Sequence, residues 1–293
     1  MKLIWSYLKS KHRWLLLDCF GGFLFVVVNL GMPTILARMI DEGITQNNPE
    51  RLTFWALMMF VIVVLGIAGR ISLVYASGKL TTSMIKELRT DIYAKLQTYS
   101  HHEYEQIGVS SLVTRMTSDA FVLMQFAEMS LRIGVVTPLM MIFSVIMILI
   151  TSPSLAWIVA VSMPFLVFVV IYVAMKTRPI STKQQQTLDK INQYVRENLM
   201  GLRVIRAFAR EDFQEERFAQ QNQEYATISS RLFTLTGLTE PLFVQIIIAM
   251  IVAIVWFALD PLAKGSLQIG DLVAFIEYSF HALFSFLIFA NLF

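Results

Sequence analysis

The sequence predicts an all-α membrane protein with six transmembrane helices and two long cytoplasmic helical hairpins. Residues of the apolar class make up 56% of the 293 positions, 15% are charged, and the mean hydropathy is +0.61. A water-soluble domain of this size does not carry so apolar a composition. The apolar residues form long runs without charge, and twenty of the 24 lysines and arginines lie between alternate runs. These observations together favour helices that cross a bilayer several times.

Six runs are long enough to cross a bilayer as helices. The first contains one charged residue, Asp18, and the second contains one, Arg70. Residues 133–175 contain no Asp, Glu, Lys or Arg, and about 20 helical residues suffice for one crossing, so this run is read as two spans. No segment shows the ten-residue alternation of a membrane barrel. The predicted spans are residues 14–37, 52–78, 133–151, 154–175, 241–259 and 272–293.

The distribution of basic residues predicts the orientation. With a cytoplasmic N-terminus, the inner segments 1–13, 76–132 and 176–239 hold twenty basic residues, whereas the outer loops hold three: Arg38, Arg51 and Lys264. This bias is the positive-inside pattern. We also expect the first 13 residues to form an amphipathic helix on the inner surface, with lipid-facing side chains at Ile4, Trp5 and Leu8.

The two long inner loops are predicted to be helical hairpins, at about 79–132 and 176–239. Each carries an apolar stripe at helical spacing, such as Leu188, Ile191 and Val195 in the second hairpin. The first apex is expected near 101–111, because Ser100 and Glu103 have capping-box spacing. The second apex is expected just past Gly201. Both apices carry apolar residues, which favours docking of a partner over a solvated turn.

The loop sequences resemble those of a known family. The first intracellular loop of ABC exporters is similar to ELRTDIYAKLQTYSHHEYEQIGVSSLVTRMTSDA (87–120), and the second is similar to VRENLMGLRVIRAFARE (195–211). The ends of the family's first outer loop and sixth helix resemble TILARMIDEGI (34–44) and IGDLVAFIEYSF (269–280). The resemblance covers nearly the whole chain. It is strongest to half-transporters of the bacterial multidrug type, often one member of a heterodimer.

The resemblance implies the ABC exporter transmembrane fold in a bacterial cell membrane. It also implies a second half-transporter, as a homo- or heterodimer, and nucleotide-binding domains that use ATP and Mg. In this family the two loop tips are short coupling helices that insert into grooves on those domains. The residues at the matching positions are Tyr104, Glu105, Gln106, Ile107, Val204, Ile205, Arg206, Ala207 and Phe208.

No nucleotide site is visible in this chain. It contains no GxxxxGK[ST] motif and no Ser-Gly-Gly signature, so we expect no bound cofactor and no ATPase activity of its own. The sequence stops within an apolar helix at Phe293, and we therefore expect a transmembrane domain without its nucleotide-binding domain. The single cysteine, Cys19, excludes an internal disulfide, and no Cys/His cluster has zinc spacing.

The substrate pathway is expected to involve the fifth and sixth spans. Glu277 and His281 are four residues apart on one helix face, and the sixth span is rich in phenylalanine. Glu277 and His281 are read either as a pair that locks the sixth helix to its neighbour or as part of a path for hydrophobic or amphipathic drugs. Lipid or peptide export, a secondary transporter and a membrane hydrolase are the alternatives; no nucleic-acid partner is expected. The candidate pathway residues are Gln245, Glu277, Phe280, His281 and Phe284.

Overall fold

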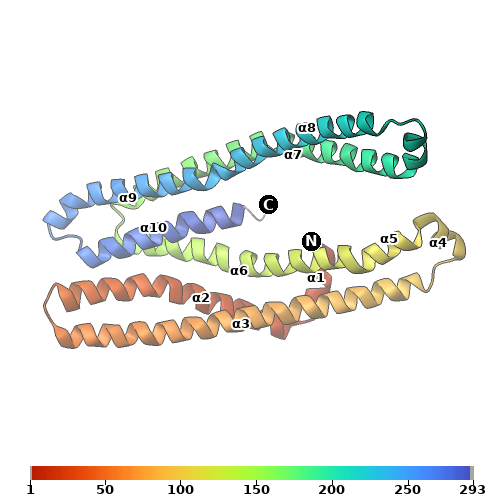
Figure 1. Cartoon of the computed structure of the whole chain (residues 1–293). Coiled ribbons are helices and arrows are strands. Elements are labelled where there is room, and N and C mark those ends of the chain that lie inside the picture. Colours follow the sequence, from red (N-terminus) through yellow and green to blue (C-terminus); the bar gives the residue numbers. More distant parts are fainter. Residues whose placement is uncertain (1, 291–293) are drawn as a thin grey trace. The chain divides into compact units, whose positions relative to one another are not determined.

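A computed structural model describes residues 2–290 and is helical almost throughout (Figure 1). None of the described residues lies in a β-strand. Two short π-helical segments, η1 and η2, interrupt the α-helices. The elements are α1 (Lys2–Lys9), α2 (His12–Arg38), η1 (Met39–Ile44), α3 (Pro49–Leu96), α4 (His101–Ile107), α5 (Val109–Thr114), η2 (Arg115–Asp119), α6 (Ala120–Thr151), α7 (Ala156–Ala207), α8 (Glu211–Gly237), α9 (Thr239–Ala263) and α10 (Ile269–Ala290).

Six of the helical stretches are long and apolar enough to cross a membrane, which confirms the predicted fold class. Most of them continue well beyond the apolar part: α3 has 48 residues and α7 has 52. Transmembrane span and stalk are therefore single helices. The last three residues of the predicted sixth span, 291–293, lie outside the described residues.

The chain forms two compact units, Met1–Trp157 with Ile254–Phe293, and Ile158–Ala253. In the first unit, α2 packs along α3, and α6 and α10 complete a bundle of four apolar helices (Figure 1). Small residues allow the close approach of α2 and α3. A Cβ atom added to Gly21 would lie 2.7 Å from the backbone nitrogen of Leu73, closer than real contacts allow. This small-residue packing is typical of helix pairs in membranes.

Helix α10 is fixed to α2 and η1 at two levels. At its start, the Gly270 amide donates a hydrogen bond of 2.8 Å to the carboxylate of Asp41, and both residues are buried. Farther along, the hydroxyls of Tyr278 and Thr34 are 2.7 Å apart, and the Tyr278 side chain is almost completely buried. A buried tyrosine hydroxyl needs such a partner, and this one pins α10 to α2 within the apolar bundle.

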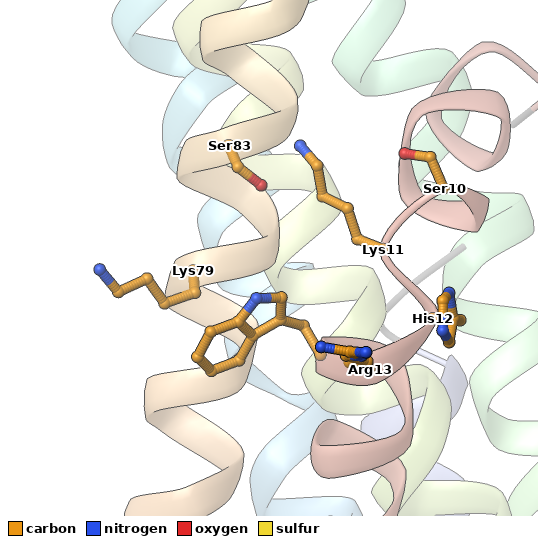
Figure 2. Close-up of a pocket in the computed structure, with 7 residues that line it drawn as sticks. Ser10, Lys11, His12, Arg13, Lys79 and Ser83 are labelled. Carbon is orange, nitrogen blue, oxygen red and sulfur yellow. The ribbon is translucent and has the colours of Figure 1, made fainter.

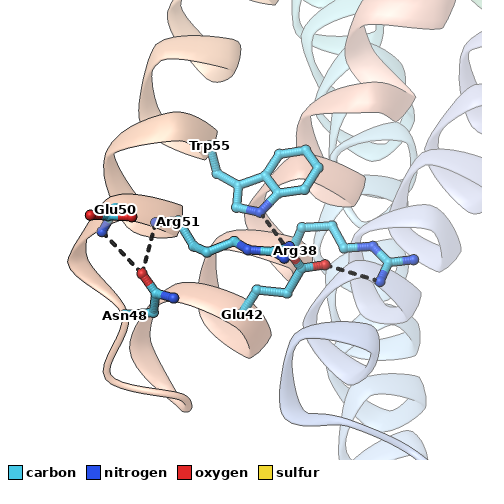
Figure 3. A network of polar contacts seen from close by, with 6 residues as sticks. All are labelled: Arg38, Glu42, Asn48, Glu50, Arg51 and Trp55. Atoms are coloured by element: carbon cyan, nitrogen blue, oxygen red, sulfur yellow. Dashed lines mark hydrogen bonds and ion pairs between the residues drawn. The ribbon is translucent and has the colours of Figure 1, made fainter.

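The turn between η1 and α3 is held by one carboxylate (Figure 3). Glu42 accepts a 2.5 Å hydrogen bond from Arg51 and a 3.2 Å hydrogen bond from the indole of Trp55, and Arg38 lies 3.4 Å away on its other oxygen. Asn48 caps α3 by accepting from the next two free amides of the helix. Hydrogen bonds to this charged carboxylate thus link the end of α2 and η1 to the start of α3.

The expected lipid-facing surface of α1 is only partly correct. Leu8 is buried against Leu80 and Met84 of α3 and against residues of α6, and Ile4 packs on the same cluster. Trp5 alone remains exposed. Helix α1 therefore covers protein rather than lipid, because a stripe that fits an apolar stalk gains the same hydrophobic burial as one that fits a membrane.

Beside the α1–α2 turn, a shallow basic pocket opens against α3 (Figure 2). Lys11 reaches from this turn to an ion pair of 2.7 Å with Glu87. The pocket is lined by Ser10, Lys11, His12, Arg13, Trp14, Lys79 and Ser83.

In the second unit, α7 and α8 run antiparallel along their polar stalks. Gln184 donates a 2.8 Å hydrogen bond to Ser229, Lys183 lies 3.7 Å from Glu224, and the guanidinium of Arg217 lies 4.6 Å from the ring centre of Tyr194. Pro164 and Pro179 lie inside α7 without ending it.

Candidate functional site

The first hairpin tip is the short helix α4, and its start follows from local sequence. Ser100 accepts a hydrogen bond from the Glu103 amide, and the Glu103 carboxylate accepts from the Ser100 amide at 2.7 Å. This reciprocal arrangement confirms the predicted capping box. Hydrogen bonds from the Ser100 amide and hydroxyl lower the pKa of Glu103, because they favour the charged carboxylate. Gly108 ends the helix with a positive φ of 80°.

The apolar residues of α4 are less free than the sequence suggested. The Tyr104 hydroxyl donates a 2.7 Å hydrogen bond to the backbone carbonyl of Leu96, so this ring folds back on the stalk. Ile107 is half-buried, whereas Glu105 and Gln106 are exposed and contact histidines one turn earlier. The exposed apolar residue beside this tip is Val109, just past Gly108. Sequence reasoning missed Val109, although its position after a helix-ending glycine was a usable signal.

The second tip is not a separate helix, contrary to what the family resemblance implied. Residues 204–207 form the last turn of α7. The helix ends because Ala209 adopts a left-handed conformation with φ of 47°. The Arg210 amide bonds to the Ile205 carbonyl at 3.0 Å, and the Ala209 amide bonds to the Arg206 carbonyl at 3.2 Å. These two bonds are a Schellman motif, with alanine where glycine is usual.

The end of α7 presents apolar side chains to solvent. Phe208 is 74% exposed and Val204 is 61% exposed, whereas Ile205 is half-buried beside Gly201. Arg206 and Ala207 are exposed as well. The exposed apolar surface also extends back along the stalk to Leu199 and Leu202, which belong to the predicted apolar stripe, and to Met200, which the sequence analysis did not select.

A cavity of about 330 Å³ opens among α2, α3, α6 and α10 of the first unit. It collects three of the five predicted pathway residues, Phe280, His281 and Phe284. The rings of Phe280 and Phe284 stack with their centres 5.5 Å apart, and the His281 ring meets Phe280 edge-on at 5.9 Å. The other lining residues are Phe25, Asn29, Arg70, Arg132, Ile133, Val136, Thr137, Met140, Ser285 and Ile288.

Two predicted pathway residues do not join this cavity. Glu277 is exposed and is not among its lining residues, and within the described part of the chain it forms no hydrogen bond with His281. The two readings of this pair, a lock between helices and a part of the pathway, stay predictions. Gln245 is exposed on α9 in the second unit, and its role stays a prediction.

Two arginines in the cavity were missed. Arg70 was recognised as a charge inside the second span, and Arg132 immediately precedes the uncharged run 133–175. Their meeting in one cavity depends on the rotation of α3 and α6 about their axes. In the described residues no group of three or more His, Cys, Asp or Glu side chains has the geometry of a metal site.

Comparisons with known proteins agree with the six-helix membrane fold. The chain matches the ABC transporter transmembrane region over residues 15–286. It is 27% identical over 252 residues to an uncharacterized ABC transporter ATP-binding protein of Mycobacterium tuberculosis (strain CDC 1551 / Oshkosh), covering 86% of this chain and 43% of the relative. YfiB of Bacillus subtilis (strain 168), also described as an uncharacterized ABC transporter ATP-binding protein, is 27% identical over 254 residues, 87% of this chain and 44% of its own.

A third relative carries a more specific description. The ATP-dependent lipid A-core flippase of Acinetobacter baylyi (strain ATCC 33305 / BD413 / ADP1) is 25% identical over 272 residues, which cover 92% of this chain and 47% of the relative. The chain spans less than half the length of these relatives.

Proposed function

The chain belongs to the family of ABC transporter transmembrane regions, and we propose that it forms the membrane-spanning part of an ATP-driven exporter. In this proposal a second half-transporter completes the pathway, and nucleotide-binding domains supply the ATP and Mg chemistry. The N-terminus and both hairpin tips face the cytoplasm, in accordance with the distribution of basic residues. The relatives named as ATP-binding proteins support the pairing of such a membrane part with nucleotide-binding domains.

The observation that carries the proposal is the exposed apolar end of α7. Val204 in the last turn of the 52-residue helix α7 and Phe208 just past its end are both exposed. Burying one phenylalanine side chain in a protein groove gains about 1.5–3 kcal/mol, so an exposed pair is suited to docking. The Schellman turn fixes the direction in which the two side chains point. We infer that this tip transmits closure of the nucleotide-binding domains to the membrane helices.

The cavity of the first unit supports an amphipathic substrate. Stacked rings and methionine provide an adaptable apolar surface, while arginine, asparagine and histidine provide polar contacts. Hydrophobic or amphipathic drugs fit this surface. Lipid export is the second candidate, because one relative is a lipid A-core flippase.

The test of coupling is Phe208→Asp in the full transporter, assembled with its nucleotide-binding domains in proteoliposomes. A charge driven into an apolar groove is unfavourable by several kcal/mol unless it is paired, so substrate-stimulated ATP hydrolysis and transport should both be lost. Folding should be unchanged, because the side chain is exposed. Phe233→Asp is the matched control: Phe233 is 70% exposed on α8 of the same hairpin, about 33 Å along that helix from its start beside the tip. Normal transport by the Phe208 variant would contradict the proposal.

A further inference from the structure

Arg70 is a charged side chain toward the inner end of the second membrane span. It lies in the cavity of the first unit, and its guanidinium sits 5.0 Å from the ring centre of Phe25. Among the described residues, no acidic side chain forms an ion pair with it. A guanidinium near the end of a membrane span either extends to the lipid–water boundary or faces a protein interior, a water-filled path or a ligand site, and Arg70 lines the cavity. The cation–π contact stabilises the guanidinium but supplies no negative charge.

Arg132 adds a second guanidinium to the same cavity from α6. It forms an ion pair with Glu128 one turn earlier. A guanidinium has five N–H donors in a planar fork, and one carboxylate does not use all of them. No carboxylate is among the residues that line the cavity, whereas Asn29 and Ser285 add neutral polar groups. The cavity is therefore cationic, with donors in excess of acceptors.

The two arginines lie toward one end of the cavity. Along α3, Arg70 lies about 32 Å from Pro49 at 1.5 Å per residue, and along α6, Arg132 lies about 29 Å from Thr151. By the same measure, Phe280 lies about 17 Å from Ile269, and Met140 lies about 17 Å from Thr151. A hydrocarbon core is about 30 Å thick, so the arginines lie near one membrane boundary, and Phe280 and Met140 lie near the middle.

We propose that this cavity selects an amphiphile with an anionic headgroup, a phosphate or a carboxylate. The headgroup accepts hydrogen bonds from Arg70 and Arg132, and its apolar chain lies against the stacked rings of Phe280 and Phe284. Planar guanidinium groups bind such anions through paired hydrogen bonds, which an ammonium cannot reproduce. With the cytoplasmic orientation of the proposed function, on which this inference rests, the arginines lie at the headgroup level of the inner leaflet.

The test is equilibrium binding to the full transporter in micelles, without nucleotide. The probes are nitrobenzoxadiazole-labelled phosphatidate and diacylglycerol with the same acyl chains, and binding is followed by fluorescence anisotropy. The wild type should prefer phosphatidate. Arg70→Gln should weaken phosphatidate binding about tenfold, the loss expected for one charged hydrogen-bonded contact, and should change diacylglycerol binding less than about twofold.

Matched variants separate charge selection from other roles. Arg70→Lys should keep most of the preference, because it keeps the charge. Arg13→Gln removes the same charge from the basic pocket at the α1–α2 turn (Figure 2) and should leave phosphatidate binding unchanged. The proposal is overturned by equal loss of both lipids in the Arg70→Gln variant, or by a wild type without headgroup preference.

Two other results would also overturn it. Displacement of labelled phosphatidate by millimolar inorganic phosphate would make the site one for a free anion rather than an amphiphile. Loss of dimer assembly in Arg70→Gln, with headgroup preference unchanged, would assign Arg70 to a carboxylate of the partner subunit. Because binding is measured without ATP, these outcomes are independent of the coupling test at Phe208. If the coupling test at Phe208 fails, the lipid site still stands without export. If the lipid-binding test fails, the chain is still part of an exporter, but of another substrate class.

Discussion

Replacing Gly270 by alanine tests how closely the start of α10 approaches α2. A Cβ atom at this position would lie 2.5 Å from a carboxylate oxygen of Asp41 and 2.8 Å from the carbonyl carbon of Ala37. It would approach the Ala37 carbonyl oxygen more closely still. Ordinary contacts begin at 3.4 Å, so α10 or α2 must move by about 1 Å. The carbonyl belongs to a helix backbone and cannot rotate away.

The expected change in unfolding free energy combines three effects. Overpacking costs about 1–3 kcal/mol. Separation of the Gly270 amide from the Asp41 carboxylate weakens a hydrogen bond to a charged group, worth about 1.5–3 kcal/mol when intact. Alanine in a helix gains at most about 1 kcal/mol over glycine. The net effect should be a destabilisation of about 2–4 kcal/mol.

Gly134→Ala is the matched control. Gly134 also lies inside an apolar helix, α6, but a Cβ atom there would meet nothing within 4 Å. This variant should be neutral or slightly stabilised. The measurement is thermal unfolding of the purified chain in one detergent, followed by intrinsic fluorescence. A fall on the order of 5–10 °C is expected for Gly270→Ala only. If both variants melt at or above the wild-type temperature, the described contact between α10 and α2 is wrong.

Three further predictions concern topology, selectivity and pH. In a Cys19→Ser background, a cysteine at Gly265 should react with an impermeant maleimide in intact cells, and one at Gln185 should not; strong labelling at Gln185 would reverse the orientation. Glu277→Gln should leave the melting temperature unchanged, because the side chain is exposed and outside the cavity. If this variant exports cationic compounds more weakly and neutral compounds normally, Glu277 belongs to the pathway. The lowered pKa of Glu103 means that the capping box stabilises α4 fully above the ordinary glutamate value of 4.5 and loses this effect as the pH falls through the lowered value. The protection of the α4 amides against hydrogen exchange, relative to the intrinsic rate at each pH, should therefore fall at acidic pH, and Glu103→Gln should show little such pH dependence.

The membrane spans and the start of α4 could be predicted because their signals are local. Residues 133–175 lack charge altogether, and no other class of structure explains so long a run. Ser100 and Glu103 meet within one helical turn, so their spacing alone determines the capping box.

The remaining features depend on geometry that sequence spacing does not contain. Alanine rarely adopts a left-handed conformation, so nothing in the sequence marked Ala209 as the residue that ends α7. Arg70 and Arg132 are far apart in sequence and share a cavity only through the packing of α3 and α6. Glu277 and Phe280 were both predicted to line the pathway, but they lie about 60° apart around α10, and Phe280 alone of the two lines the cavity.

Helix α3 has a mechanical consequence. It runs for 48 residues, about 72 Å, and its only proline is the first residue, so no proline interrupts its backbone hydrogen bonds. One end leads into the turn before α4, and Glu42 links the other end to the end of α2. A displacement of α4 is therefore carried along one continuous helix to the far end of α3. The first non-helical segment between this helix and the tip is residues 97–100.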